Sequence, residues 1–299
     1  MAIGRLLMES QVFNMNTLSG NDQPKQILTL LPTTALAHRD QVDIASCFSM
    51  RIAIVTLFTE EIADYGAIGA ANKQAYGRRH GYDCFVYRER LDTRRHPAWS
   101  KLVAIKRHLP DYDWVFWTDA DSLVMNGERT LEAIIAKQEN KDMILTWEAG
   151  ASPVNTGQWL IRNTEWSDAT LSAIENPACS NSWPKWFEQG ALIEWLKADE
   201  RRWNHLALVH PRVMNSTPPV ALYDHLSVRR SRFRRGDFII HFWPLARRQE
   251  AVLNMMIEYD ALSKCPPPRF TWHSLSRLKF EWPGRASAKL HKRASRDEV

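Results

Sequence analysis

Residues 113–121 read Asp-Trp-Val-Phe-Trp-Thr-Asp-Ala-Asp, and they give the strongest indication of fold class in the sequence. The apolar run from Trp114 to Trp117 predicts a strand that is buried on both faces, as in the middle of a parallel sheet. The run leads into two acidic residues, Asp119 and Asp121. Ligands of open α/β sheets bind beyond the carboxyl ends of the strands. The stretch therefore predicts a central strand that delivers two carboxylates to a ligand-binding edge.

The segments on either side of this strand alternate between strand and helix patterns. Before it, the patterns predict strands at 51–58 and 84–87 and helices at 62–80 and 99–109. After it, they predict helices at 131–138, 166–174 and 186–197, strands at 142–147, 158–162, 206–209 and 238–242, and an arginine-rich loop at 229–235. This alternation indicates an α/β fold in which helices flank a mixed, mainly parallel sheet.

Composition and charge narrow the class of protein. The chain has 299 residues, of which 44% are hydrophobic and 24% charged, so disordered and collagen-like chains are excluded. The four cysteines form no C-x-x-C pair, which argues against a zinc cluster. Residues 264–299 carry nine Lys or Arg against three acidic residues, a balance of +6, and the rest of the chain therefore carries −1 of the total +5. A nearly neutral body argues against nucleic-acid binding.

The same patterns divide the chain into three parts. We expect residues 1–50 to form a poorly structured extension, with Met50 as a candidate start. Residues 51–262 would form one folded domain, and 263–299 a basic, partly disordered tail. The apolar run at 27–31 is too short to span a membrane. We therefore expect a cytoplasmic protein, in which the basic tail is either a solubilising segment or a contact with the inner surface of the membrane.

Two D-x-D triplets occur, and their positions distinguish them. The triplet from Asp111 to Asp113 precedes the strand beside a proline and fits a turn or cap. The carboxylates of Asp119 and Asp121 follow the strand, where they would repel each other unless a cation or a shared proton intervened. Hard oxygen ligands of this kind suit Mg²⁺ or Mn²⁺ bridging a diphosphate. The residues alone leave a solvated acidic turn as the other interpretation.

Motifs of several enzyme classes are absent from the sequence. It contains no phosphate loop, dinucleotide fingerprint, H-E-x-x-H or G-x-S-x-G, which excludes standard kinases, dehydrogenases, zinc proteases and lipases. A phosphatase of the haloacid-dehalogenase type is a minor alternative, because its nucleophilic aspartate also lies in an Asp-x-Asp after an apolar strand. That family has Thr or Val where this chain has Leu123, and its later acidic pair is missing near Asp237.

The order of several short motifs resembles glycosyltransferase family 34, the galactosyl-, mannosyl- and xylosyltransferases of fungi and plants. The motifs are collinear over residues 51–245, and the ordered set is far more specific than any single member. The matching segments are Asn72-Lys73 with Tyr76, His80-Gly81-Tyr82, 97–101, 117–121, Asn155-Thr-Gly157, 160–163 with 166–167, Glu188-Gln189, Asn215-Ser216 and 236–242.

The resemblance implies a single catalytic domain with the Rossmann-like GT-A fold and a nucleotide-sugar donor. It also implies retention of the anomeric configuration and a divalent cation, Mn²⁺ or Mg²⁺. Asp119, Asp121 and His241 would be the metal ligands. Judged from its neighbours alone, a histidine in the apolar run 239–242 would more often be a core residue whose ring nitrogens are hydrogen-bonded inside the protein.

The resemblance also supplies candidates for binding the donor. Lys101 would reach the phosphates as a point charge, and the turn from Asn155 to Gly157 would contact the sugar. The end of the first strand would face the nucleotide base. Judged from the residues alone, a solvated lysine and an ordinary loop explain these features as well. The donor-binding candidates are Thr56, Phe58, Lys101, Asp119, Ala120, Asp121, Asn155 and Gly157.

Glu188 and Gln189 are the catalytic candidates. The family match would place Gln189 beneath the anomeric carbon, where its weakly nucleophilic amide favours substitution on one face, with Glu188 as an electrostatic or acceptor-binding group. A covalent intermediate stays open, and so does a purely structural role for this pair at a helix N-terminus. Asn215 and Ser216 are candidates for a turn on the acceptor side.

Together these features predict a metal-dependent, retaining glycosyltransferase. Its donor would be a nucleoside diphosphate sugar, with a UDP-hexose preferred, and its acceptor a glycan or glycolipid. The alternative from another class is a non-catalytic protein that binds carbohydrates or anions on the same fold, using its tryptophans as stacking platforms.

Overall fold

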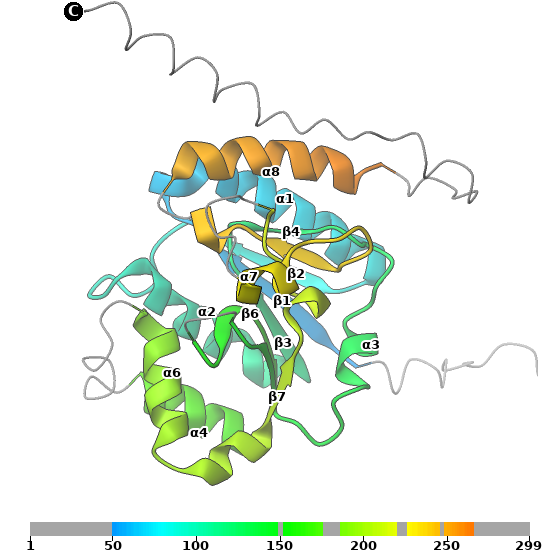
Figure 1. The fold of residues 1–299 in the computed structure, drawn as a ribbon. Helices are drawn as coiled ribbons and strands as arrows, with labels where there is room; N and C mark the ends of the chain where they lie inside the picture. The colour runs from blue at the N-terminus through cyan, green and yellow to red at the C-terminus, as the bar shows by residue number, and fades with distance from the viewer. Residues whose placement is uncertain (1–49, 149–151, 176–185, 220–225, 246–247, 266–299) are drawn as a thin grey trace, which may run out of the picture. The chain divides into compact units, whose positions relative to one another are not determined.

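The computed structural model describes residues 50–148, 152–175, 186–219, 226–245 and 248–265. Their centre is a six-stranded sheet of order β2-β1-β3-β6-β5-β7 (Figure 1). The expectations for the N-terminal extension and for the tail beyond Cys265 lie outside these ranges. The strands are β1 (Ile52–Leu57), β2 (Asp83–Tyr87), β3 (Trp114–Thr118), β5 (Met143–Thr146), β6 (Asn155–Arg162) and β7 (Leu206–Val209).

The sheet is mixed and mainly parallel, as the sequence predicts. β1 pairs in parallel with β2 and β3, and β5 pairs in parallel with β7. Only β6 runs against its neighbours, β3 and β5. The carboxyl ends of β1, β3 and β5 therefore meet the amino end of β6 at one edge of the sheet, which we call the ligand edge.

Alternation along β1 separates the two faces of the sheet. Ala53, Val55 and Leu57 pack in a core with residues of α2 (Ser100–His108), α4 (Glu165–Ile174) and α6 (Phe187–Lys197). Ile52 and Ile54 pack on the other face with Tyr76 of α1 (Ala63–His80). Both sets are buried, which explains why the strand reads as a continuous apolar run. The helix α1 ends where predicted, at Gly81, whose φ of 75° is left-handed.

A second, two-stranded sheet joins segments far apart in the sequence. It pairs β4 (Ser122–Val124) with β8 (Ile239–His241) in antiparallel fashion, so that Ser122 lies opposite His241. The helices α1 and α8 (Gln249–Ser263) lie side by side next to this sheet (Figure 1). The side chain of Asn72 on α1 bonds both backbone groups of Val124, accepting from its nitrogen at 2.7 Å and donating to its oxygen at 3.2 Å. This small sheet is thus fixed to α1.

Several segments differ from the sequence expectations, among them β4, which was not predicted, and the helix expected at 131–138, which is shorter. The Asn155–Gly157 segment, expected as a turn, is the start of strand β6, because its backbone pairs with β5. Part of the expected loop at 229–235 is helical, since α7 spans Leu226–Ser231. The helix α8 was not predicted, although Val252, Met256 and Tyr259 carry its buried face at helical spacing. The remaining short helix is α3 (Glu132–Ile135). In the described ranges, no helix is long and apolar enough to cross a bilayer.

Candidate metal and donor-binding site

A pocket of about 480 Å³ opens at the ligand edge. Its walls come from the ends of β1 and β3, the start of β6, the start of α6 and the end of β8. Aromatic side chains from separate segments, among them Tyr65, Phe187 and Trp243, stand beside charged ones. The pocket therefore has both the polar and the flat apolar groups that a nucleotide-sugar needs.

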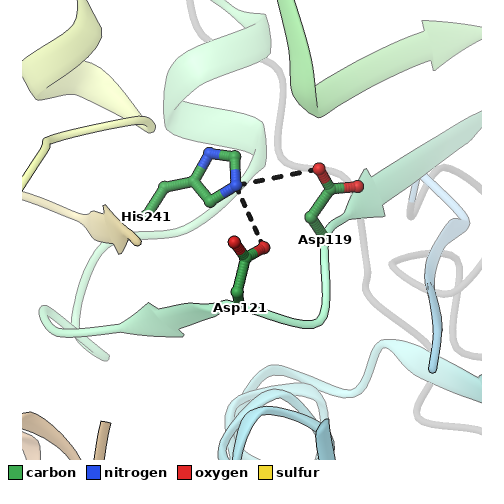
Figure 2. A group of neighbouring side chains, drawn as sticks. All are labelled: Asp119, Asp121 and His241. Atoms are coloured by element: carbon green, nitrogen blue, oxygen red, sulfur yellow. Dashed lines mark hydrogen bonds and ion pairs between the residues drawn. The ribbon is translucent and has the colours of Figure 1, made fainter. Parts of the chain in front are cut away.

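Two carboxylates and an imidazole converge in this pocket (Figure 2). The Nε2 atom of His241 lies 3.1 Å from Oδ1 of Asp121 and 3.7 Å from Oδ2 of Asp119. One potential ligand atom from each residue lies within 4.8 Å of the other two. Asp119 directly follows β3 of the six-stranded sheet, whereas Asp121 directly precedes β4 and His241 ends β8 of the two-stranded sheet. The site thus sits where the two sheets meet.

The ring of His241 is held in one orientation from behind. Its Nδ1 lies 2.7 Å from Oδ1 of Asn215, whose own Nδ2 donates to the Thr146 hydroxyl at 2.8 Å. Because Asn215 offers an oxygen, Nδ1 donates to it, and the other ring nitrogen, Nε2, faces the two carboxylates. Three electron-rich groups facing one another are unfavourable unless a cation or a proton lies between them.

The carboxylate of Asp119 is also oriented by its neighbours. The indole nitrogen of Trp117 donates to Oδ1 at 2.6 Å, and Nζ of Lys101 lies 3.2 Å from the same oxygen. The other oxygen, Oδ2, is the one that faces His241. The backbone of this segment is fixed as well, since the nitrogen of Asp119 donates to the oxygen of Gly157 at 2.8 Å. The donor atoms are therefore positioned before any ligand arrives.

This donor set fits a divalent cation. Two carboxylates and an imidazole suit Mn²⁺ and Mg²⁺, and a metal-bound histidine commonly donates its other ring N–H to an oxygen, which Asn215 supplies here. The opening into the pocket leaves room for further oxygen ligands from a substrate. The residues that would hold the ion are the three that the sequence predicts, Asp119, Asp121 and His241.

Lys101 and Glu188 form a buried ion pair beside this group. Nζ of Lys101 lies 2.7 Å from Oε1 of Glu188, and both side chains are 5% exposed. Burial alone would lower the pKa of Lys101, but the charges of Asp119 and Glu188 outweigh burial and raise it. The hydroxyl of Thr156 donates to the same oxygen of Glu188 at 3.0 Å. Lys101 is thus neither a solvated helix-face residue nor a free charge.

Replacing Lys101 by methionine is expected to lower the free energy of unfolding by about 3–5 kcal/mol, because Glu188 would lose its ion-pair partner in the interior. Urea unfolding measures this change. The matched control is Lys106→Met on the same helix, which breaks a 2.8 Å pair with Glu175 whose side chains are 31% and 25% exposed. That variant should cost less than about 1 kcal/mol. Equal losses for the two variants would contradict the prediction.

Gln189 and Glu148 occupy the same wall of the pocket. Oε1 of Gln189 accepts from the backbone nitrogen of Thr156 at 3.1 Å, and its Nε2 donates to Oε2 of Glu148 at 3.4 Å. Asn155 also donates to that carboxylate, at 3.2 Å. Burial raises the pKa of Glu148, and this effect outweighs the two hydrogen bonds, which lower the pKa. The sequence analysis missed Glu148, although it comes directly after a predicted strand and so had the same signal as Asp119.

A second buried lysine, Lys73, lies behind the acidic turn. It is 1% exposed, and its Nζ donates to the backbone oxygen of Ser122 at 2.8 Å. Burial lowers the pKa of Lys73 to about 8, and the nearby charges of Asp121, Cys84 and Asp119 oppose this effect. The residue is therefore predominantly charged at pH 7.

Comparison with known proteins identifies the family. The profile of the galactosyl transferase GMA12/MNN10 family matches residues 51–154 and 137–246, and together these ranges hold more than half of the chain. The chain belongs to this family. The resemblance to glycosyltransferase family 34 is thereby confirmed.

Curated members of the GMA12/MNN10 family show how far the similarity extends. An uncharacterized alpha-1,2-galactosyltransferase of Schizosaccharomyces pombe is 24% identical over 203 residues, which are 57% of this chain and 60% of that protein. The probable alpha-1,6-mannosyltransferase MNN10 of Saccharomyces cerevisiae is 22% identical over 215 residues, 58% of this chain and 54% of that protein. The chain thus spans between half and two thirds of the length of these relatives.

Among solved structures, a glycosyltransferase involved in the glycosylation of the major capsid of PBCV-1 has a similar fold. Its TM-score is 0.56 at 19% identity, and the match covers 70% of this chain and 99% of that one. The expected α/β fold of the GT-A type is therefore confirmed for this member of the family.

The structure brings most of the predicted site residues together and separates three of them. Phe58, Lys101, Asp119, Ala120, Asp121, Asn155, Gly157, Glu188, Gln189 and His241 all line the pocket. Thr56 does not, because it lies within β1 and is 1% exposed. Asn215 and Ser216 are not on its surface either. Asn215 supports His241, and the hydroxyl of Ser216 donates to Asp237 at 2.8 Å, so both side chains are used in the interior.

Proposed function

We propose that this member of the GMA12/MNN10 family is a metal-dependent glycosyltransferase. It would transfer a sugar from a nucleoside diphosphate donor to a carbohydrate or glycolipid acceptor, with retention of the anomeric configuration. The convergence of Asp119, Asp121 and His241 in the pocket at the ligand edge carries the proposal. Sugar transfer by the named relatives supports the reaction class.

Asp119, Asp121 and His241 would hold Mn²⁺ or Mg²⁺ on the floor of the pocket. When bound, the ion would offset the negative charge that develops on the departing nucleoside diphosphate. The protein contributes a rigid set of donors, since Asn215 fixes the histidine ring and Trp117 fixes one oxygen of Asp119. We prefer UDP to GDP as the nucleotide and a hexose as the sugar.

Phe58 and Ala120 would form the donor side of the pocket, and Asn155 and Gly157 its sugar side. Gly157 is required there for a steric reason, because a methyl group on it would overlap Cε1 of His241 and lie 2.8 Å from Nδ1. Lys101 would add positive charge near the phosphates, although Glu188 and Asp119 share its ammonium group. Its effect on a phosphate would therefore be that of a buried and partly compensated charge.

Gln189 supports substitution on one face of the sugar rather than two displacements. Its carboxamide is held in the pocket wall by Thr156 and Ser152, and an amide is a weak nucleophile. The carboxylate of Glu188 is engaged by Lys101 and Thr156. In the one-face reaction, the acceptor oxygen bonds to the anomeric carbon as the bond to the diphosphate breaks. The hydroxyl proton of the acceptor passes to a departing phosphate oxygen.

Three expectations about the wider role of this protein stay predictions. The basic residues beyond Cys265 would provide a contact with a membrane surface, and they lie outside the described residues. The cytoplasmic location and a role in polysaccharide or glycolipid synthesis likewise follow from the sequence reasoning alone.

Thermal unfolding of the full chain with UDP tests the proposal. At 100 times its Kd, UDP should add about 2.7 kcal/mol to the free energy of unfolding. For a domain of this size that corresponds to a rise in Tm of roughly 5–10 °C. The rise should require Mn²⁺ or Mg²⁺, and the same cation should support slow hydrolysis of a UDP-sugar. No stabilisation and no hydrolysis with UDP- or GDP-sugars and any divalent cation would instead favour a non-catalytic binding protein.

A further inference from the structure

Lys73 is an unusual residue to find behind a cation site. It lies on the face of α1 that packs toward the acidic turn. A methyl group on Gly69, one helical turn earlier, would overlap the backbone oxygen of Ala120 and lie 3.1 Å from Nζ of Lys73. The ammonium group is therefore directly behind the segment that carries Asp119 and Asp121.

Among the described residues, Lys73 forms no ion pair with a carboxylate. Its hydrogen-bond partner is a neutral backbone oxygen, that of Ser122. Lys101 differs in this respect, because Glu188 and Asp119 lie within 3.2 Å of its Nζ. A buried ammonium without a carboxylate partner is unfavourable, and a methionine would fill a similar volume at lower cost. A lysine at this position would be explained if its positive charge, and not only its volume, were needed there.

The carboxylates whose charges act on Lys73 are those of the candidate metal site. Lys73 interacts electrostatically with Asp121 and Asp119. A fixed positive charge at this place has opposite effects on the two components of a metal–diphosphate complex. It repels a bare divalent cation, and it attracts the negative charges of a diphosphate.

We propose that Lys73 is a positioning residue whose buried charge weakens the binding of a bare divalent cation and so couples cation binding to the diphosphate. The inference rests on the proposed function. With Lys73 in place, the cation and the nucleotide would bind much more tightly together than separately. Because coupling is reciprocal, each would strengthen the binding of the other by the same factor.

The test uses the full chain with Lys73→Met and Lys73→Gln at pH 7.0. Both substitutions remove the charge, and glutamine keeps a donor for the oxygen of Ser122, which guards against a variant that fails to fold. Electron paramagnetic resonance of free Mn²⁺ gives the affinity for MnCl₂ alone, and calorimetry gives the affinity for UDP at saturating Mn²⁺. We expect Mn²⁺ alone to bind about tenfold more tightly and UDP about tenfold more weakly than in the wild type.

Lys141→Met is the matched control. Its Nζ also donates to a single backbone oxygen, that of Asn204 at 2.8 Å, but the residue is only half-buried and precedes β5, at the opposite edge of the sheet. This variant should bind Mn²⁺ and UDP as the wild type does. A purely structural role for Lys73 would leave the affinity for Mn²⁺ unchanged or weaken it, and that result in folded Lys73 variants would overturn the inference. Wild-type protein that binds neither Mn²⁺ nor UDP with Mn²⁺ would instead overturn the proposed function.

Discussion

Asp121→Asn is expected to reduce kcat/KM for Mn²⁺-dependent turnover of a UDP-sugar by roughly a thousandfold. The amide has nearly the same shape as the carboxylate but carries no negative charge, so one of the two anionic ligands is lost. The fold should persist, because the backbone oxygen of this residue still accepts from Phe242 at 2.8 Å. Steady-state kinetics and Mn²⁺ titration of the purified variant measure both effects.

Asp111→Asn is the control for this experiment. Asp111 belongs to the other D-x-D triplet, is exposed and lies at the opposite end of β3. The control should keep its activity within about twofold of the wild type, as surface substitutions away from a site usually do. An Asp121→Asn enzyme with normal turnover and normal dependence on Mn²⁺ would show that the cation is not bound where we place it.

Gly157→Ala is expected to disable the same site without changing any ligand. The added methyl group would overlap Cε1 of His241, lie 2.8 Å from Nδ1 and lie 3.0 Å from Oδ1 of Asn155. The ring is 2% exposed and tied to Asn215, so it cannot move aside without breaking that hydrogen bond. We expect the affinity for Mn²⁺ and kcat/KM each to fall by about a hundredfold. This is the upper end of the effect seen when a residue that orients a metal ligand is changed.

Gly127→Ala provides the comparison for the glycine variant. A methyl group on Gly127 would approach nothing closer than Nη1 of Arg79, at 3.8 Å. Its Mn²⁺ affinity and activity should equal those of the wild type.

Overpacking at Gly157 should also lower the free energy of unfolding by about 1–3 kcal/mol, which chemical denaturation would detect. Wild-type Mn²⁺ affinity in Gly157→Ala would refute the tight contact between Gly157 and His241.

Local sequence patterns were sufficient to predict the buried strands and the edge at which they end. The apolar run before Asp119 is buried from Trp114 to Thr118, and it does deliver its carboxylate to the ligand edge. The distant histidine could be predicted only through the family motif, because pairing of β4 with β8 brings it to Asp121 and no local pattern encodes that pairing. Only the first of these results depends on the rule that the carboxyl ends of parallel strands share an edge.

The roles of some residues, and the conformation of one segment, depend on tertiary contacts that local sequence patterns do not encode. Asn215 has the residue type of an acceptor-binding turn, but its position behind His241 makes it a support for the ring. Lys101 has the spacing of a solvated helix residue, yet Glu188, 87 positions later, draws it into the interior. The strand character of residues 155–157 comes from pairing with β5, which outweighs the turn tendency of Asn and Gly.

The change of sheet at Ala120 limits the insertions and deletions that the chain can accept there. Asp119 directly follows β3 and Asp121 directly precedes β4, so a turn of only three residues, 119–121, joins the two strands. One extra residue in this turn would change the separation of the two carboxylates, which must stay within a fraction of an ångström of their arrangement with His241 to hold one cation. A library of single-residue insertions should therefore yield functional clones in the surface turns and none between positions 119 and 122.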